Sequence, residues 1–243
     1  MRSLSASEML TAWERGLPQR PIERALTLLA VNRPEALPDD LAKLSIGRRD
    51  ACLLSLREQT FGSDMVCLAN CPRCAERLEL NLNIADLLLP DIPEPGLLSL
   101  DVDGYEIEFR LPNSFDLVRI VDNKDLYTSR QLLLNECLLR IEHEGEAKQS
   151  DDLPENVIAA IVNVMAQADP QADVQLALAC PLCSHQWQTS FDVLSFFWSE
   201  LNAWALRTLH DVHTLASAYG WCEPDILALS PIRRQVYLEM VSG

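Results

Sequence analysis

The amino-acid sequence predicts an α+β protein in which two distant β-hairpins make a split zinc ribbon. The first observation is a pair of Cys-Pro-x-Cys motifs, at residues 71–74 and 180–183. The second is hydrophobic periodicity, because apolar residues recur at helical intervals near both ends of the chain but alternate with polar residues around the two motifs. We therefore expect helical N- and C-terminal segments and a mixed α/β insertion between the hairpins.

The N-terminal segment, residues 1–62, is predicted to be helical. Apolar residues recur at helical intervals over residues 8–14, 21–31 and 41–59, so we expect a helix in each of these ranges. Pro21 suits the first position of the second helix, because the first N–H group of a helix has no acceptor within it and proline lacks this group.

The split ribbon is predicted in residues 63–84 and 173–192. In both parts, apolar and polar residues alternate with a period of two after the second cysteine, as in a half-buried strand. Residues 71–82 also align without gaps to residues 180–191, and an apolar strand candidate precedes each motif. We therefore expect two similar hairpins, each with a Cys-Pro-x-Cys motif as its turn.

Residues 85–172 are predicted to form the mixed α/β insertion. Three prolines within residues 89–97 indicate an irregular connection. The dipeptide Asp103-Gly104 tolerates positive φ angles, and alternating residues on both sides of it predict another hairpin over residues 98–111. The later elements are expected in this order: helices from Pro112 to about Ile141, a solvated polar loop over residues 142–152, and a helix over residues 154–168.

The C-terminal segment, residues 193–243, is predicted to be helical. A long amphipathic pattern predicts one helix over residues 193–219, and Gly220 suits its end because glycine adopts the left-handed backbone conformation without steric cost. A second helical stretch over residues 223–241 contains Ser230-Pro231, where we expect a break.

The cysteine motifs predict one structural zinc ion. Zinc prefers four thiolate or imidazole ligands in a tetrahedron, and a Cys-x-x-Cys turn supplies two thiolates from one loop. Cys71, Cys74, Cys180 and Cys183 would complete the tetrahedron and leave no open position for a water or a substrate. Zn²⁺ in this position would join two segments that lie far apart in the sequence.

Three other interpretations of the same cysteines remain open. Thiol–disulfide chemistry also uses Cys-Pro-x-Cys, but neither motif stands where a strand leads into a helix. An iron–sulfur cluster takes the same four ligands. The third interpretation is a site that has lost its metal.

Other cysteine, histidine and acidic residues are better explained by structure than by chemistry. Cys67 is expected to face inward from its strand as a small apolar residue. We expect His185 on the surface, and His210 and His213 as ordinary residues of a long helix. The acidic residues of the hairpin over residues 98–111 have no nucleophile motif nearby, so they indicate a solvated face.

Composition and charge indicate a protein that binds other proteins. The net charge of −16 disfavours nucleic acid and anionic membranes as partners. The absence of a secretion signal and of a membrane-spanning run predicts a cytoplasmic protein whose thiols stay reduced. With no glycine-rich phosphate loop and no nucleophile motif, we expect neither catalysis nor a small-molecule substrate.

Five residues near the C-terminus are candidates for contact with a partner protein. Aromatic residues are rare in the chain, yet several cluster at the start of the long helix, and two arginines flanked by apolar residues lie in the last helix. Aromatic and arginine side chains contribute strongly to protein interfaces. The candidates are Trp198, Trp204, Arg233, Arg234 and Tyr237.

Four further motifs, together with both cysteine motifs, suggest a family. They are Gly47-Arg-Arg-Asp-Ala51, Leu56-Arg-Glu-Gln-Thr-Phe-Gly62, Phe109-Arg-Leu-Pro-Asn-Ser-Phe-Asp-Leu117, and Ala218-Tyr-Gly-Trp-Cys-Glu-Pro-Asp-Ile-Leu227 followed by Arg233-Arg234 and Tyr237-Leu238. Over most of residues 45–243, the chain resembles baseplate-associated proteins of phage tail-like contractile injection systems. It is more distantly similar to the baseplate hub assembly proteins of T-even phages.

The resemblance implies a non-enzymatic role in building a baseplate. The chain would act as an assembly chaperone or as a minor subunit, with a baseplate hub or spike protein as its partner. Two alternatives remain open: a zinc-ribbon regulator that binds nucleic acid, and a thiol–disulfide oxidoreductase that uses Cys-Pro-x-Cys.

Overall fold

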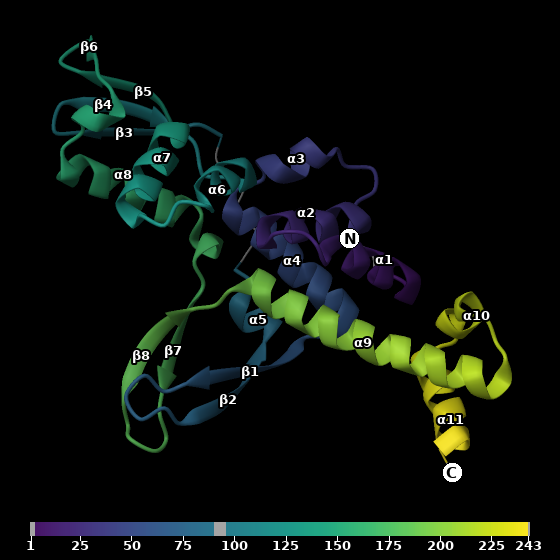
Figure 1. Ribbon diagram of the computed structural model, residues 1–243. Helices are drawn as coiled ribbons and strands as arrows, with labels where there is room; N and C mark the ends of the chain where they lie inside the picture. Colours follow the sequence, from purple (N-terminus) through teal and green to yellow (C-terminus); the bar gives the residue numbers. More distant parts are fainter. Residues whose placement is uncertain (1–2, 90–95, 243) are drawn as a thin grey trace.

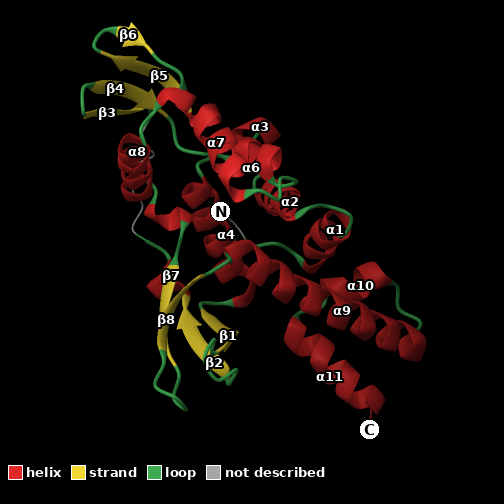
Figure 2. Cartoon of the chain, turned by 60° about the vertical axis from the view of Figure 1, so that its left-hand side comes forward, coloured by secondary structure: helices red, strands yellow, loops and turns green. Residues whose placement is uncertain are grey.

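The computed structural model describes residues 3–89 and 96–242 and confirms a mixed α+β protein with small sheets. A helical body lies at the centre, the two cysteine hairpins lie side by side on one flank, and the sheet of the insertion lies on another (Figures 1 and 2). One long helix, α9, leaves the central body and carries the two last helices at its far end (Figure 1). The shape is therefore branched around a central body.

Four helices form the N-terminal part. They are α1 (Ala6–Gly16), α2 (Pro21–Asn32), α3 (Pro38–Lys43) and α4 (Ile46–Phe61). The predicted single helix over residues 41–59 is wrong at its start, because the chain turns out of the helical conformation at Leu44 and begins again after Ser45. The Ser45 hydroxyl caps α4 by accepting a hydrogen bond from the Arg48 amide, which explains the new start.

Both predicted cysteine hairpins are present. Strand β1 (Asp64–Asn70) pairs with β2 (Arg77–Asn83), and β7 (Gln175–Ala179) pairs with β8 (Gln186–Ser190), both antiparallel. They form separate sheets rather than one continuous sheet. The short helix α5 (Ile84–Leu87) follows β2, and the 3₁₀ turn η2 (Pro170–Ala172) precedes β7.

The insertion contains a sheet in the order β3-β4-β5-β6. Its elements are β3 (Leu98–Val102), β4 (Tyr105–Phe109), α6 (Ser114–Ile120), α7 (Leu126–Cys137), β5 (Leu138–His143), β6 (Glu146–Ala147), η1 (Ser150–Asp152) and α8 (Glu155–Ala168). The hairpin around Asp103-Gly104 is confirmed, and both turn residues have positive φ angles. Most of the expected irregular connection over residues 89–97 lies outside the described residues.

The prediction of helix as far as Ile141 is wrong, and so is that of a loop over residues 142–152. Helix α7 ends at Cys137, and β5 then pairs with β4, so that Ile141 lies opposite Ile107. Both isoleucines are buried in a core shared with α7 and α8. Pairing with a distant strand therefore overrides the local helical pattern.

The C-terminal part follows the prediction. Helix α9 (Val193–Tyr219) ends at Gly220, which has the left-handed conformation, and α10 (Glu223–Ala228) and α11 (Pro231–Ser242) are separated by a break before Pro231. The first half of α9 is buried against the N-terminal helices, and its second half shares a small core with α10 and α11. Helix α9 is thus part of two hydrophobic cores.

Arg57 ties the central body to the first cysteine hairpin and to α9. Its side chain is buried in α4. It donates two hydrogen bonds to Glu200 of α9, at 2.8 and 2.7 Å. It also donates to the carbonyls of Gly62 and Asp64 at 2.6 and 2.9 Å. A buried arginine needs such partners, since an unpaired buried charge is strongly destabilising.

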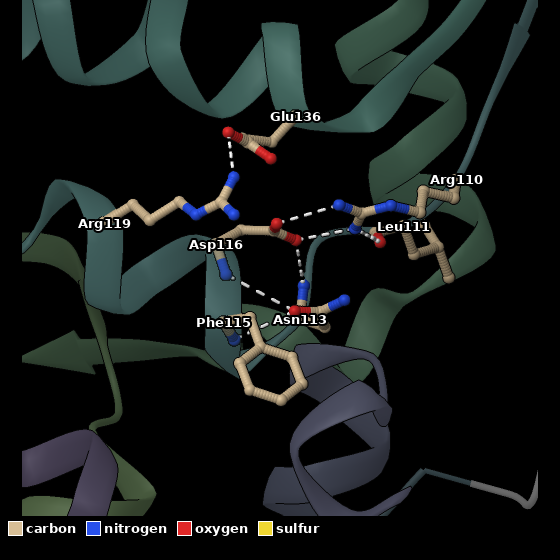
Figure 3. Close-up of polar contacts among 7 residues, drawn as sticks. All are labelled: Arg110, Leu111, Asn113, Phe115, Asp116, Arg119 and Glu136. Atoms are coloured by element: carbon tan, nitrogen blue, oxygen red, sulfur yellow. Dashed lines mark hydrogen bonds and ion pairs between the residues drawn. The ribbon is translucent and has the colours of Figure 1, made fainter. Parts of the chain in front are cut away.

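A second ion pair, between the partly exposed Arg110 and the buried Asp116, organises the turn from β4 into α6. Figure 3 shows the Asp116 carboxylate accepting hydrogen bonds from the Arg110 guanidinium, at 2.6 and 2.8 Å, and from the Asn113 amide. The Asn113 side chain caps α6 in return, by accepting from the amides of Phe115 and Asp116. Burial alone would raise the pKa of Asp116, but these hydrogen bonds outweigh it and hold the pKa below its usual value.

Gly47 marks a tight junction between α4 and the end of the insertion. Its amide donates to the Asp169 carboxylate at 2.8 Å. A Cβ atom at this position would collide with that carboxylate and would lie 2.8 Å from the Ala172 amide nitrogen. Glycine is therefore required where the chain returns from the insertion to the hairpins.

We expect Gly47→Ala to lower the free energy of unfolding by about 1–3 kcal/mol, because the added methyl group overpacks a closed contact. Gly96→Ala is the matched control, since a Cβ atom at Gly96 would meet no other atom within 4 Å. Urea unfolding followed by circular dichroism measures both variants. Equal stability of the two variants would contradict the requirement for glycine at position 47.

We expect Asp116→Asn to lower the free energy of unfolding by about 1.5–3 kcal/mol at pH 7, since it removes charged hydrogen bonds. A lowered folded-state pKa contributes stability above the ordinary carboxyl pKa of about 4, and this contribution is lost as the pH falls through the folded-state value. The difference from wild type should therefore shrink as the pH falls below about 4. Asp101→Asn, on an exposed position, should show no such pH-dependent difference in urea unfolding.

Candidate metal centre

The four predicted cysteines converge at the tips of the two hairpins. The sulfur atoms of Cys71, Cys74, Cys180 and Cys183 all lie within 4.8 Å of one another. Cys71 Sγ lies 3.7 Å from Cys183 Sγ, and Cys74 Sγ lies 3.6 Å from Cys180 Sγ. Elsewhere in the described ranges, no other group of three or more cysteine, histidine or acidic side chains is close enough to share a metal.

The two cysteine turns have the same backbone structure. The Cys71 amide donates to the Glu76 carbonyl at 2.8 Å, and the Cys180 amide donates to the His185 carbonyl at the same distance. A second hydrogen bond, at 2.9 Å, joins the residue after each motif to its first cysteine. These residues, Ala75 and Ser184, both have positive φ angles. The gapless sequence alignment thus corresponds to two equivalent turns.

The surroundings of the thiols shift the pKa values of Cys71 and Cys74 in opposite directions. Burial opposes ionisation of Cys71, but hydrogen bonds from the backbone amides of Cys74 and Arg73 outweigh it and lower the pKa of Cys71 to about 7. The Glu76 amide also favours the Cys74 thiolate, yet burial and contact with the other three sulfurs raise the pKa of Cys74 to about 12. A positive charge among the sulfurs would allow all four to ionise.

The geometry fits a tetrahedral metal ion. A bond of about 2.3 Å from zinc to each sulfur places the sulfurs of a regular tetrahedron about 3.8 Å apart. The two separations between sulfurs of opposite turns, 3.6 Å from Cys74 to Cys180 and 3.7 Å from Cys71 to Cys183, are close to that edge. The first cysteine of each turn is buried, whereas Cys74 is exposed and Cys183 is half-buried. The four thiols therefore can hold a metal ion at the rim of the hairpin pair.

The neighbouring candidate ligands lie elsewhere. Cys67 is buried in the central core as predicted, and burial raises the pKa of its thiol. His185 does not join the sulfur group but stacks on Trp187, with ring centres 5.9 Å apart. His210 and His213 are both exposed on α9.

The five candidate partner residues have different surroundings. Trp198 packs beside Gly16 beneath the Arg24 guanidinium, which lies 4.5 Å from its ring centre. Tyr237 contacts the rings of Tyr219 and Trp221.

Trp204 is half-buried and lines a groove beside the middle of α9. Arg233 is exposed, whereas Arg234 is buried in the same groove. Partner binding by these five residues stays a prediction.

Sequence analysis missed the role of Arg57, which connects the hairpin to the core. Arg57 belongs to one of the family motifs, but the motif gives no indication that this arginine is buried. A cationic residue that follows a run of leucines, one turn before the glycine that ends the helix, is the signal that marks it. Asn113 and Asp116, three positions apart, carry the analogous signal of a helix N-terminus.

The chain is thus a helix-rich α+β protein with a four-thiol site that joins two distant hairpins. A family model described as T4 bacteriophage base plate protein matches residues 31–198, more than half of the chain. The chain belongs to this family, as the motif resemblance predicted. No curated protein and no solved structure matches it. Within residues 3–89 and 96–242, no helix combines the length and apolarity needed to cross a membrane.

Proposed function

We propose that this protein is a non-enzymatic component of the baseplate of a phage tail-like contractile injection system, acting by protein–protein recognition. Membership of the base plate family is the observation that carries the proposal. The matched residues, 31–198, include both cysteine motifs and the whole insertion. The role is that of an assembly chaperone or a minor subunit, with a baseplate hub or spike protein as partner.

We further propose that the four thiolates hold one structural zinc ion. The separations of the sulfurs support this, because they are close to the edge of a zinc–thiolate tetrahedron. Cys71, Cys74, Cys180 and Cys183 would all act as ligands, so the metal would have no open position for catalysis. The ion would supply charge neutralisation and a crosslink between the two hairpins.

The two alternative functions have less support. A thiol oxidoreductase needs one accessible nucleophilic thiol, whereas each sulfur here lies beside a sulfur of the opposite turn. A nucleic-acid regulator needs a basic surface, whereas the chain carries a net charge of −16. The reduced thiols needed for metal binding suit assembly in the cytoplasm.

We expect purified, reduced protein to contain about one zinc ion per chain by inductively coupled plasma mass spectrometry. Cys71→Ser and Cys180→Ser should each lose most of the metal, because a tetrahedral site loses one ligand. Cys67→Ala is the matched control, since Cys67 lies in the same hairpin outside the sulfur group. Metal-free wild type, iron in place of zinc, or equal loss in the control would contradict the zinc assignment.

We expect the tagged chain, co-expressed with the baseplate proteins encoded beside it, to retain a hub or spike protein during affinity purification. Mass spectrometry of intact particles then separates the two roles, because a subunit stays in the particle and a chaperone does not. Recovery of no baseplate protein would count against the proposed function.

A further inference from the structure

The middle of α9 lines a groove that lies apart from the metal centre. It has a volume of ≈ 1090 Å³ and lies between the start of α1, the middle of α9 and the region where α10 leads into α11. Apolar residues from these elements make up much of its lining: Leu4, Met9, Trp204, Leu227, Leu229 and Pro231. Thr60 of α4 also lines it, so the groove brings N-terminal and C-terminal helices together.

Charged side chains also line this groove. Arg207 and His210 of α9 and Arg234 of α11 contribute basic groups, and Asp211 contributes a single carboxylate. Arg207 is exposed at the rim, whereas Arg234 is only 7% exposed. In a chain with a net charge of −16, this is a local cluster of positive charge.

Arg234 lacks the carboxylate partner that the other two buried arginines of the described residues have. Arg57 donates to Glu200 through two nitrogen atoms, and Arg49 likewise pairs with Asp50. The Arg234 guanidinium has no hydrogen-bond or ion-pair acceptor among the residues that the structure describes, and its Nε atom is buried without a partner. Asp211 attracts it only through space, and burial raises the pKa of that carboxyl despite the attraction.

We infer that this groove binds an apolar segment of a partner protein and that Arg234 hydrogen-bonds an Asp or Glu side chain within it. A buried guanidinium without an acceptor is costly, and a carboxylate matches its planar set of donors. The apolar lining favours a protein segment over a free anion, because much of the bound surface would be hydrocarbon. The inference rests on the proposed function, in which the chain recognises another baseplate protein.

Random twelve-residue peptides with amidated C-termini, displayed and selected on the folded wild-type protein, test this inference. We expect enriched peptides to carry one Asp or Glu flanked by apolar residues. By fluorescence anisotropy, Arg234→Met should weaken their binding about tenfold to a hundredfold, since it removes a hydrogen bond to a charged group. Arg15→Met is the matched control, because Arg15 is exposed and outside the groove, and it should bind as wild type does.

Arg207→Glu tests the same site without touching the core, so it remains informative if Arg234→Met fails to fold. We expect it to weaken peptide binding at least tenfold, whereas Arg15→Glu, at an exposed position outside the groove, should change it less than threefold. Enriched peptides without acidic residues, no enrichment at all, or equal effects of the paired variants would overturn the inference.

Co-expression with the baseplate proteins encoded beside this chain tests the groove and the proposed function separately. A baseplate protein retained by wild type but lost with Arg207→Glu supports both. Equal retention of a baseplate protein by wild type and by Arg207→Glu supports the proposed function and contradicts partner binding in the groove. Peptide binding that depends on Arg207 and Arg234, with no baseplate protein retained, supports the groove and counts against the proposed function.

Discussion

The structure depends on the buried guanidinium of Arg57. It fixes three things at once: the end of α4, the backbone turn that leads into β1, and the side of α9 through Glu200. The second hairpin runs directly into α9, with β8 ending at Ser190 and the helix beginning at Val193. One side chain therefore links the start of the first hairpin to the helix that follows the second, which helps to bring together cysteines 106 positions apart at their tips.

The insertion needs a comparable constraint at its other end. Gly47 and Asp169 hold its exit against α4, and the Gln171 side chain hydrogen-bonds Leu87 and Leu89 on its entry side. With its two ends pinned together, the insertion builds a core of its own from β4, β5 and α8. The length of this insertion adds little to the entropic cost of folding, because the cost of closing a loop grows slowly with the number of residues in it.

The sequence was sufficient for features that depend on neighbouring residues. The cysteine turns, the Asp103-Gly104 hairpin and the end of α9 at Gly220 all follow from short-range geometry. Strand β5 was missed because its partner β4 lies about thirty positions earlier, and pairing between them outweighs a locally helical pattern.

Among the candidate site residues, too, some could be predicted from the local sequence and others depend on tertiary packing. Spacing alone identified the four cysteines, because each Cys-x-x-Cys turn is recognisable from four consecutive residues. It did not distinguish Arg233 from Arg234, since adjacent residues on a helix differ only in which way they face. That direction is set by packing of α11 on α9, a tertiary fact without a local pattern.

Helix α9 has a mechanical consequence. Its 27 residues form one uninterrupted helix with a length of about 40 Å, anchored at one end in the central core and at the other among α10 and α11 (Figure 1). Because both ends are packed in hydrophobic cores, the helix holds the central body and the two C-terminal helices at a fixed spacing and orientation.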